Sequence, residues 1–118
     1  MSEQRWPGWV YGTGSEPDPR FSFANERTFL AWLRTALALV AGGVALDAFD
    51  LPLDSVVRQV LVVALLVLGA LCAGASWLRW ARAERAMRRG EPLPSSPLAP
   101  VLTVGLLLVT LLLLVALW

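Results

Sequence analysis

A run of 20 residues without a charged side chain, from Gln59 to Leu78, most constrains what this chain can fold into. As an α-helix rising about 1.5 Å per residue, the run spans the roughly 30 Å hydrocarbon layer of a membrane. A second uncharged run extends from Pro92 to Trp118. Its prolines favour an extended linker before a helix near residue 99, and Trp118 is typical of an interfacial anchor.

The first span has a shorter uncharged stretch. Only 12 residues, Thr35 to Leu46, separate Arg34 from Asp47. A helix of that length covers about 18 Å, so one of these two charges must lie below the membrane surface. If Leu46 marks the outer boundary, the span reaches back to Phe29 and places Arg34 more than one turn inside, where a guanidinium is costly.

The composition agrees with a membrane protein. Of the 118 residues, 57% are hydrophobic and only 16% are charged, a balance that a water-soluble domain of this size cannot bury. We predict an all-α membrane protein with three transmembrane helices, at about residues 29–49, 59–78 and 99–118. They form one domain over residues 21–118, preceded by a polar, aromatic N-terminal tail over residues 1–20 that lacks the apolar core of a secretory signal.

The basic residues, all of them arginines, predict the orientation. Five follow the second span, on an expected continuation of its helix: Arg79, Arg82, Arg85, Arg88 and Arg89. A positive loop stays in the cytoplasm, whereas the loop after the first span carries three aspartates, so we expect a cytoplasmic N-terminus and an outside C-terminus. The arginine loop attracts anionic lipid headgroups; docking of a soluble partner or polyanion is the alternative.

Polar side chains concentrate at the entrance of the first helix, where Asn25, Glu26, Arg27 and Thr28 are followed by Arg34 and Thr35. Helical spacing puts Arg27 and Arg34 on one stripe with Ala31, Ala38, Ala41 and Ala45. The other sides carry Phe29, Leu30, Trp32, Leu33, Leu37 and Leu39. We expect the arginine stripe to face protein or a water-filled cavity, and the bulky residues to face lipid.

Two interpretations of these arginines remain open. In the first, Asn25 and Glu26 cap the helix start, while Arg27 and Arg34 pair with carboxylates or reach phosphate headgroups. In the second, several copies of the chain assemble around an axis, and the arginines form stacked cationic rings that attract an anionic solute. Arginine suits that task because it stays charged at depth and its fork matches phosphate oxygens two at a time.

Small residues four apart predict close helix packing. The second helix has the pairs Gly69/Ala73 and Ala70/Gly74, and the first has Ala38/Gly42 and Ala41/Ala45. The alternative is chance, since alanine and glycine are common in membrane helices. The third helix, mostly leucine and valine, is expected to face lipid.

Several classes of function are excluded. The chain has no histidine and a single cysteine, Cys72, so neither an internal disulfide nor a metal site is expected. No nucleophile stands beside a base and no carboxylate pair lies in a span, so we expect no enzyme activity and no cofactor. A nucleic-acid partner is not expected either. A homo-oligomeric anion-conducting module remains, with a structural or accessory subunit of a larger membrane complex, or a lipid-organising protein, as the alternative.

The segment Phe23–Arg34, F-A-N-E-R-T-F-L-A-W-L-R, closely resembles the signature of the YidH-like family of bacterial inner-membrane proteins, a domain of unknown function. The resemblance extends in layout to residues 20–118 and implies a multi-pass protein of the bacterial inner membrane. The family's membrane module is also similar to that of the fungal vacuolar transporter chaperone complex. That complex makes polyphosphate and passes it through a channel lined by basic residues of its first helix.

Carried over to this chain, the resemblance implies that Arg27 and Arg34 contact phosphate or line a pore, with Glu26 as their acidic neighbour. Asn25, Thr28 and Thr35 would support them. Phosphate or polyphosphate is then the implied solute. Polyphosphate synthesis is not implied, because no polymerase domain accompanies the helices.

Overall fold

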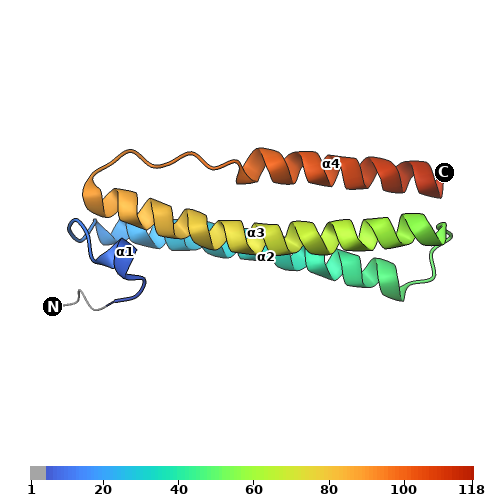
Figure 1. The fold of residues 1–118 in the computed structure, drawn as a ribbon, viewed down its shortest axis with the longest axis horizontal. Helices are drawn as coiled ribbons and strands as arrows, with labels where there is room; N and C mark the ends of the chain where they lie inside the picture. The colour runs from blue at the N-terminus through green and yellow to red at the C-terminus, as the bar shows by residue number, and fades with distance from the viewer. Residues whose placement is uncertain (1–4) are drawn as a thin grey trace.

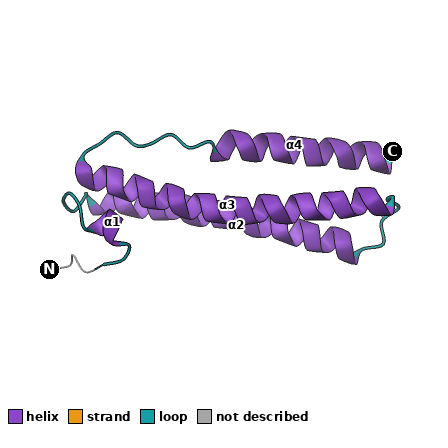
Figure 2. Cartoon of the chain, in the orientation of Figure 1, coloured by secondary structure: helices purple, strands orange, loops and turns teal. Residues whose placement is uncertain are grey.

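The structure, a computed structural model, describes residues 5–118, and over that range it consists of helices joined by loops (Figure 2). The helices are α1 (Gly8–Tyr11), α2 (Pro19–Ala48), α3 (Ser55–Arg89) and α4 (Leu98–Leu117). The last three are each long and apolar enough to cross a membrane. The predicted all-α fold with three membrane-spanning helices is therefore confirmed.

Polar residues, a proline and a glycine set the ends of the two long helices. Asp18 accepts a hydrogen bond from the backbone N–H two residues on (2.9 Å), and Pro19 takes the first helical position, where no N–H is needed. Asp54 caps α3 through the N–H of Val56 (3.0 Å). α3 ends at Arg89 and is capped by Gly90, whose φ of 66° is a left-handed conformation that glycine adopts without strain.

Both long helices extend past the spans predicted for them. α2 starts at Pro19, before the membrane span predicted from about residue 29, so its first turn includes residues that were assigned to the tail. α3 continues through Arg89, past the predicted end of the membrane span near residue 78. The prediction that the arginine run continues the second helix is thus confirmed, while the division into a tail and a domain of residues 21–118 stays a prediction.

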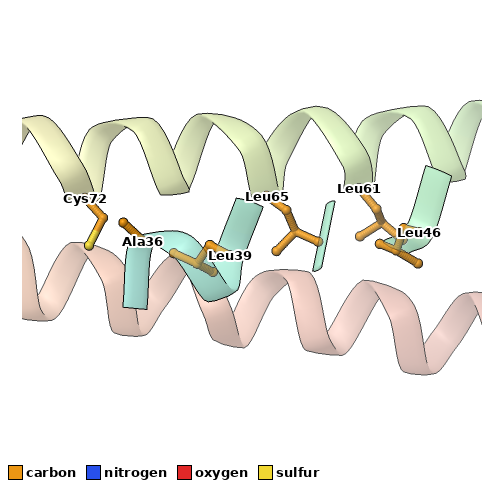
Figure 3. Packing of buried hydrophobic residues seen from close by; sticks show 6 residues of the cluster. All are labelled: Ala36, Leu39, Leu46, Leu61, Leu65 and Cys72. Carbon is orange, nitrogen blue, oxygen red and sulfur yellow. The ribbon is translucent and has the colours of Figure 1, made fainter. Parts of the chain in front are cut away.

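α3 forms the middle of the bundle, with α2 packed along one side and α4 along another (Figure 1). The buried core lies between α2 and α3, and its members follow one another at steps of three, four or seven residues, that is, one or two helical turns. Figure 3 shows its members: Ala36, Leu39 and Leu46 from α2, and Leu61, Leu65 and Cys72 from α3. Such spacing places the apolar side chains of each helix on a single stripe, so the two stripes can bury each other.

One prediction about which side chains of α2 face lipid is wrong. Leu39 is buried and Trp32 packs against the core cluster, although both were expected to face lipid. Leu30 and Leu37 do lie on exposed sides of α2. The expectation failed for the first pair because a neighbouring helix of the same chain provides an apolar surface that the sequence pattern does not distinguish from lipid.

The two ends of the bundle differ in charge. One end, here called the basic end, holds the start of α2, the N-terminal segment and the five arginines from Arg79 to Arg89. The other, here called the acidic end, holds Asp47, Asp50 and Asp54. The linker of residues 91–97 leaves the basic end and turns back to the start of α4 (Figure 1).

Candidate functional site

Arg27 and Arg34 lie on the side of α2 that faces away from α3. Both are exposed, as are Ala31, Ala38 and Ala41 along the same stripe, and we call these five residues the arginine face. The buried stripe of α2 lies on the opposite side, and α4 contacts α3 rather than α2. Within residues 5–118, therefore, nothing from the same chain covers the arginine face.

The length of α4 allows the depth of other residues in the membrane to be derived. Its 20 residues rise about 30 Å, the thickness of the hydrocarbon layer, so Leu98 marks the boundary at the basic end. Gly105 packs against Leu68 of α3, since a Cβ on this glycine would lie 2.8 Å from Cδ2 of the leucine. Gly105 is about 10 Å past Leu98 along the helix, and Leu68 shares that depth.

The register between α2 and α3 then gives the depth of Arg34. Cys72, one turn from Leu68 toward the basic end, lies about 4 Å inside the boundary. Its thiol donates a hydrogen bond to the backbone carbonyl of Trp32 (3.4 Å), which fixes the level of α2. Arg34, two residues farther along α2, is consequently about 7 Å inside, more than one helical turn.

The polar neighbours of these arginines do not pair with them inside the chain. Thr28 and Thr35 donate their hydroxyls to backbone carbonyls one turn back in α2, at 3.1 and 3.3 Å. Across the described part of the chain, Glu26, Arg27 and Arg34 form no hydrogen bond or ion pair. Glu26 thus does not act as an acidic partner of either arginine within one copy of the protein.

Asn25 has a different place from the one expected, because Asp18 caps α2 and neither Asn25 nor Glu26 lies at the helix start. Asn25 lies within α2 rather than at its start, and it is buried. Its side-chain amide donates to the carbonyl of Trp80 (3.0 Å) and to Oε1 of Glu84 (3.3 Å). The capping interpretation of these two residues is therefore wrong.

Glu84 anchors a polar cluster at the basic end, formed by Ser22, Asn25 and Glu84. Glu84 is only 3% exposed. Each of its oxygens accepts one hydrogen bond, Oε2 from the hydroxyl of Ser22 at 3.1 Å and Oε1 from Asn25. Buried carboxylates need such partners, because an unpaired one is strongly destabilising.

The N-terminal segment folds back onto the basic end and forms a strap, defined here as residues 5–17. Arg88 of α3 holds it: the guanidinium donates to the carbonyls of Tyr11 (3.1 Å) and Thr13 (3.0 Å) and pairs with Glu16 (2.7 Å). The N–H of Ser15 donates to the carbonyl of Arg88 at 2.9 Å. Arg88 is thus buried under the strap instead of standing free in a basic loop.

Aromatic rings complete the contact between the strap and the helices. Trp6 stacks on Trp77 with ring centroids 5.7 Å apart, and Tyr11 lies 6.5 Å from Trp80. Phe29 of α2 also approaches Trp80, at 6.3 Å. Tilted and offset aromatic pairs of this kind stabilise packing beyond their buried area.

Two titratable groups of the strap respond to this packing. Hydrogen bonds from Arg5 and then Arg88 hold the pKa of Glu16 below its ordinary value. Burial, followed by the charge of Glu84, raises the pKa of Tyr11. The docked strap therefore favours an ionised Glu16 and a neutral Tyr11.

The small residues predicted for packing fall into two groups. Gly69 lies against α2, and Ala73 packs against the core cluster between α2 and α3. A Cβ added to Gly42 would lie 3.8 Å from Leu65. Ala38 is exposed on the arginine face, and an added Cβ on Gly74 would meet nothing within 4 Å. Within one copy of the chain, Ala38 and Gly74 thus make no helix contact.

The remaining arginines of the basic end have unlike surroundings. Arg89 pairs with Glu91 at 3.3 Å. Arg79 and Arg82 line a cavity between α3 and the linker of residues 91–97, whereas Arg85 does not line that cavity. In the described residues, no three histidine, cysteine, aspartate or glutamate side chains are grouped so that they could hold a metal ion.

Sequence reasoning missed the polar cluster and the strap. Glu84 stands among the arginines that follow the second span, and its sequence position alone gave it no role. Trp80 and Glu84 follow buried Ser76 at steps of four residues, so they lie on the same side of α3. Extending the buried stripe of α3 past the membrane boundary would therefore have predicted that Glu84 is buried. No local pattern indicates that residues 5–17 fold back, because their partners are about seventy residues away.

Known proteins resemble this chain over most of its length. The family model described as a domain of unknown function, DUF202, matches residues 20–86. An uncharacterized protein of Mycobacterium tuberculosis is 52% identical over 82% of this chain and 80% of its own length. The inner membrane protein YidH of Escherichia coli is 49% identical over 69% of this chain and 71% of its own length.

No solved structure matches this chain. The similarity to inner-membrane proteins agrees with three helices long enough to cross a membrane. Since the family model covers more than half of the sequence, the chain belongs to the DUF202 family and is a multi-pass protein of the bacterial inner membrane.

Proposed function

We propose that the chain is a homo-oligomeric membrane module whose arginine face lines a path for an anion, with phosphate or polyphosphate as the solute. In this assembly α2 of each copy lies nearest the axis, and α3 and α4 surround it. The role is conduction or binding of the solute rather than catalysis.

The exposure of Arg34 inside the membrane carries the proposal. Its Cα lies about 7 Å below the boundary set by α4, on the side of α2 that no other part of the described chain covers. A guanidinium in contact with hydrocarbon is destabilising. A water-filled path shared by several copies removes that penalty without an acidic partner in the same chain.

The rest of the arginine face supports this arrangement. Ala31, Ala38 and Ala41 are small, so they leave room beside the two arginines for water and solute, or for close approach of another helix. Arg27 lies two turns from Arg34 toward the basic end. Copies arranged around an axis would stack these arginines as two cationic rings, one at the membrane boundary and one inside.

The solute class rests on the chemistry of arginine and on the resemblance to the fungal polyphosphate-conducting module. Two guanidinium N–H groups donate to two phosphate oxygens at once, and arginine remains charged at depth. Successive rings would bind a polyanion at several points with each contact weak enough to release it.

Anion flux from liposomes tests the proposal. The purified protein is reconstituted and the release of phosphate, polyphosphate and chloride is compared for the wild type, Arg34→Ala, Arg34→Lys and the control Arg89→Ala, which removes an exposed arginine outside the face. We expect Arg34→Ala to lower the flux at least about tenfold, Arg34→Lys to retain part of it and the control to leave it unchanged.

Cross-linking tests the assembly separately. In a Cys72→Ala background, a cysteine at Ala41 on the arginine face is compared with one at Leu71, which is exposed on α3. Disulfide-linked dimers should form from Ala41→Cys and not from Leu71→Cys. A monomer in both variants, together with no flux above protein-free liposomes for any anion, would instead favour the accessory-subunit role.

A further inference from the structure

A cavity of about 150 Å³ lies where α3, the linker of residues 91–97 and the start of α4 meet. Arg79 and Arg82 are its charged lining residues, and Ser95 and Ser96 line it from the linker. Ala75, Leu78, Pro94 and Pro97 provide the rest of the lining. The cavity therefore combines two cations and two hydroxyls with an apolar wall.

The side of α3 that faces α4 explains why the two arginines lie there. Four residues of α3 follow one another at steps of seven, four and three residues, so they share a side of the helix: Leu68, Ala75, Arg79 and Arg82. The apolar half of this side packs against α4, as the contact of Leu68 with Gly105 indicates. The basic half extends past the start of α4 and faces the linker.

Neither arginine is neutralised within the described chain. Arg79 and Arg82 form no hydrogen bond or ion pair over residues 5–118. Nη1 of Arg79 is shielded from solvent and still lacks a hydrogen-bond acceptor among these residues. A buried guanidinium nitrogen without an acceptor is unfavourable, and an anion bound in a cavity that Arg79 lines would supply the missing acceptor.

The two acids within and just after the arginine run of α3 have other partners. Glu84 accepts hydrogen bonds from Ser22 and Asn25, and Glu91 pairs with Arg89. The hydroxyl of Ser96 accepts from the N–H of Leu98 at 3.2 Å, which keeps the linker close to the first turn of α4. An acceptor for Arg79 and Arg82 must therefore come from outside this part of the chain.

The depth of the cavity indicates which anion reaches it. It lies at the first residues of α4, the boundary between hydrocarbon and headgroups for a helix of this length. Phosphate oxygens of phospholipids occupy that layer, and guanidinium forks and hydroxyls are their preferred donors. The apolar wall formed by Ala75 and Leu78 continues toward the acyl chains.

We infer that this cavity binds the phosphodiester of an anionic phospholipid, with Arg79 and Arg82 as its main donors and Ser95 as an additional one. The site lies on α3 and the linker, away from the arginine face, so it does not depend on the proposed conduction. A bound lipid would join the linker to α3 and hold α4 against the bundle.

Native mass spectrometry of the full chain in detergent tests the site. Phosphatidylglycerol, zwitterionic phosphatidylcholine and inorganic phosphate are titrated separately against the wild type, R79Q/R82Q and the control R85Q/R89Q. The two double variants remove the same charge from the same end of the bundle. A third variant, Ser95→Trp, fills the cavity without changing the charge, and R79K/R82K keeps the charge without the guanidinium fork.

We expect one phosphatidylglycerol per chain to survive at voltages that strip phosphatidylcholine. Its affinity should fall on the order of tenfold in R79Q/R82Q and in Ser95→Trp, less in R79K/R82K, and little in R85Q/R89Q. Thermal melting of each variant shows that it is folded. Equal losses in the two glutamine double variants would mean unspecific attraction and overturn the site, and equally tight binding of inorganic phosphate would overturn the assignment to a lipid.

Discussion

A Cβ atom added to Gly69 of α3 would lie 2.6 Å from Cγ2 of Val40 in α2. The same atom would also lie 3.1 Å from the backbone carbonyl oxygen of Ala36, which cannot rotate away. The lack of a side chain at Gly69 is therefore what permits the close approach of the two helices at this level. Gly74, farther along α3, has nothing within 4 Å of such an atom.

Gly69→Ala should consequently separate α2 from α3 locally and destabilise the protein by about 1–3 kcal/mol. Gly74→Ala is the matched control, since the same methyl group meets open space and alanine favours the helix. The measurement is unfolding in mixed detergent micelles followed by circular dichroism. Equal stability of the two variants would contradict the packing described for Gly69.

Arg88→Ala should release the strap, because Arg88 supplies hydrogen bonds to the carbonyls of Tyr11 and Thr13 and the ion pair with Glu16. Cleavage after Tyr11 by chymotrypsin is expected to accelerate about tenfold or more. Arg89→Ala removes a neighbouring exposed arginine that pairs only with Glu91 in the described chain, and should leave the rate unchanged. A similar acceleration in both variants would mean that Arg88 has no special part in docking.

The docking of the strap should depend on acid pH through Glu16. Its pKa in the docked state lies below the ordinary value of 4.5, so its contribution is fully present above about pH 4.5 and is lost as the pH falls through the lower value. Tyr11 is the sole tyrosine, so fluorotyrosine gives a single NMR signal beside Trp80. That signal should shift toward the undocked position on acidification.

Glu16→Gln supplies the control for this titration. Without an ionisable group at position 16, the acid-induced part of the signal change should be much reduced, and the strap should be less firmly docked at neutral pH. A transition of unchanged size in Glu16→Gln would show that another group controls the acid response.

Asn25→Ala should destabilise the basic end, because it removes donors to the carbonyl of Trp80 and to the buried carboxylate of Glu84. Loss of a hydrogen bond that leaves a buried acceptor costs about 1–3 kcal/mol. Glu26→Gln, at the next and exposed position, should stay within about 0.5 kcal/mol of the wild type. Thermal unfolding of both variants in one detergent provides the comparison.

The orientation predicted from the arginines is open to chemical labelling. In a Cys72→Ala background, Asp50→Cys at the acidic end should react with a membrane-impermeant maleimide added to intact spheroplasts. Glu91→Cys at the basic end should react only in inside-out vesicles, because positive loops stay in the cytoplasm. The reverse pattern would place the N-terminus outside.

The sequence alone was sufficient for the number of membrane helices and for the continuation of the second helix through the arginine run. Uncharged runs such as Gln59–Leu78 are long enough to span hydrocarbon, and each spanning segment must satisfy its own backbone hydrogen bonds, so such runs form helices. That Arg27 and Arg34 share one stripe of α2 also follows from the spacing of 3.6 residues per turn. These are properties of single helices.

Which side of α2 meets α3 was decided only by the tertiary structure, since an apolar side chain such as Leu39 packs equally well against lipid or a helix. The buried carboxylate of Glu84, the fold-back of the strap onto Arg88 and the cavity at Arg79 likewise depend on contacts between residues far apart in the chain. Local periodicity reports how a residue is oriented on its own helix. Which other residue contacts it depends on how the helices pack together. The contacts of Glu84, Arg88 and Arg79 were therefore decided only by the three-dimensional structure.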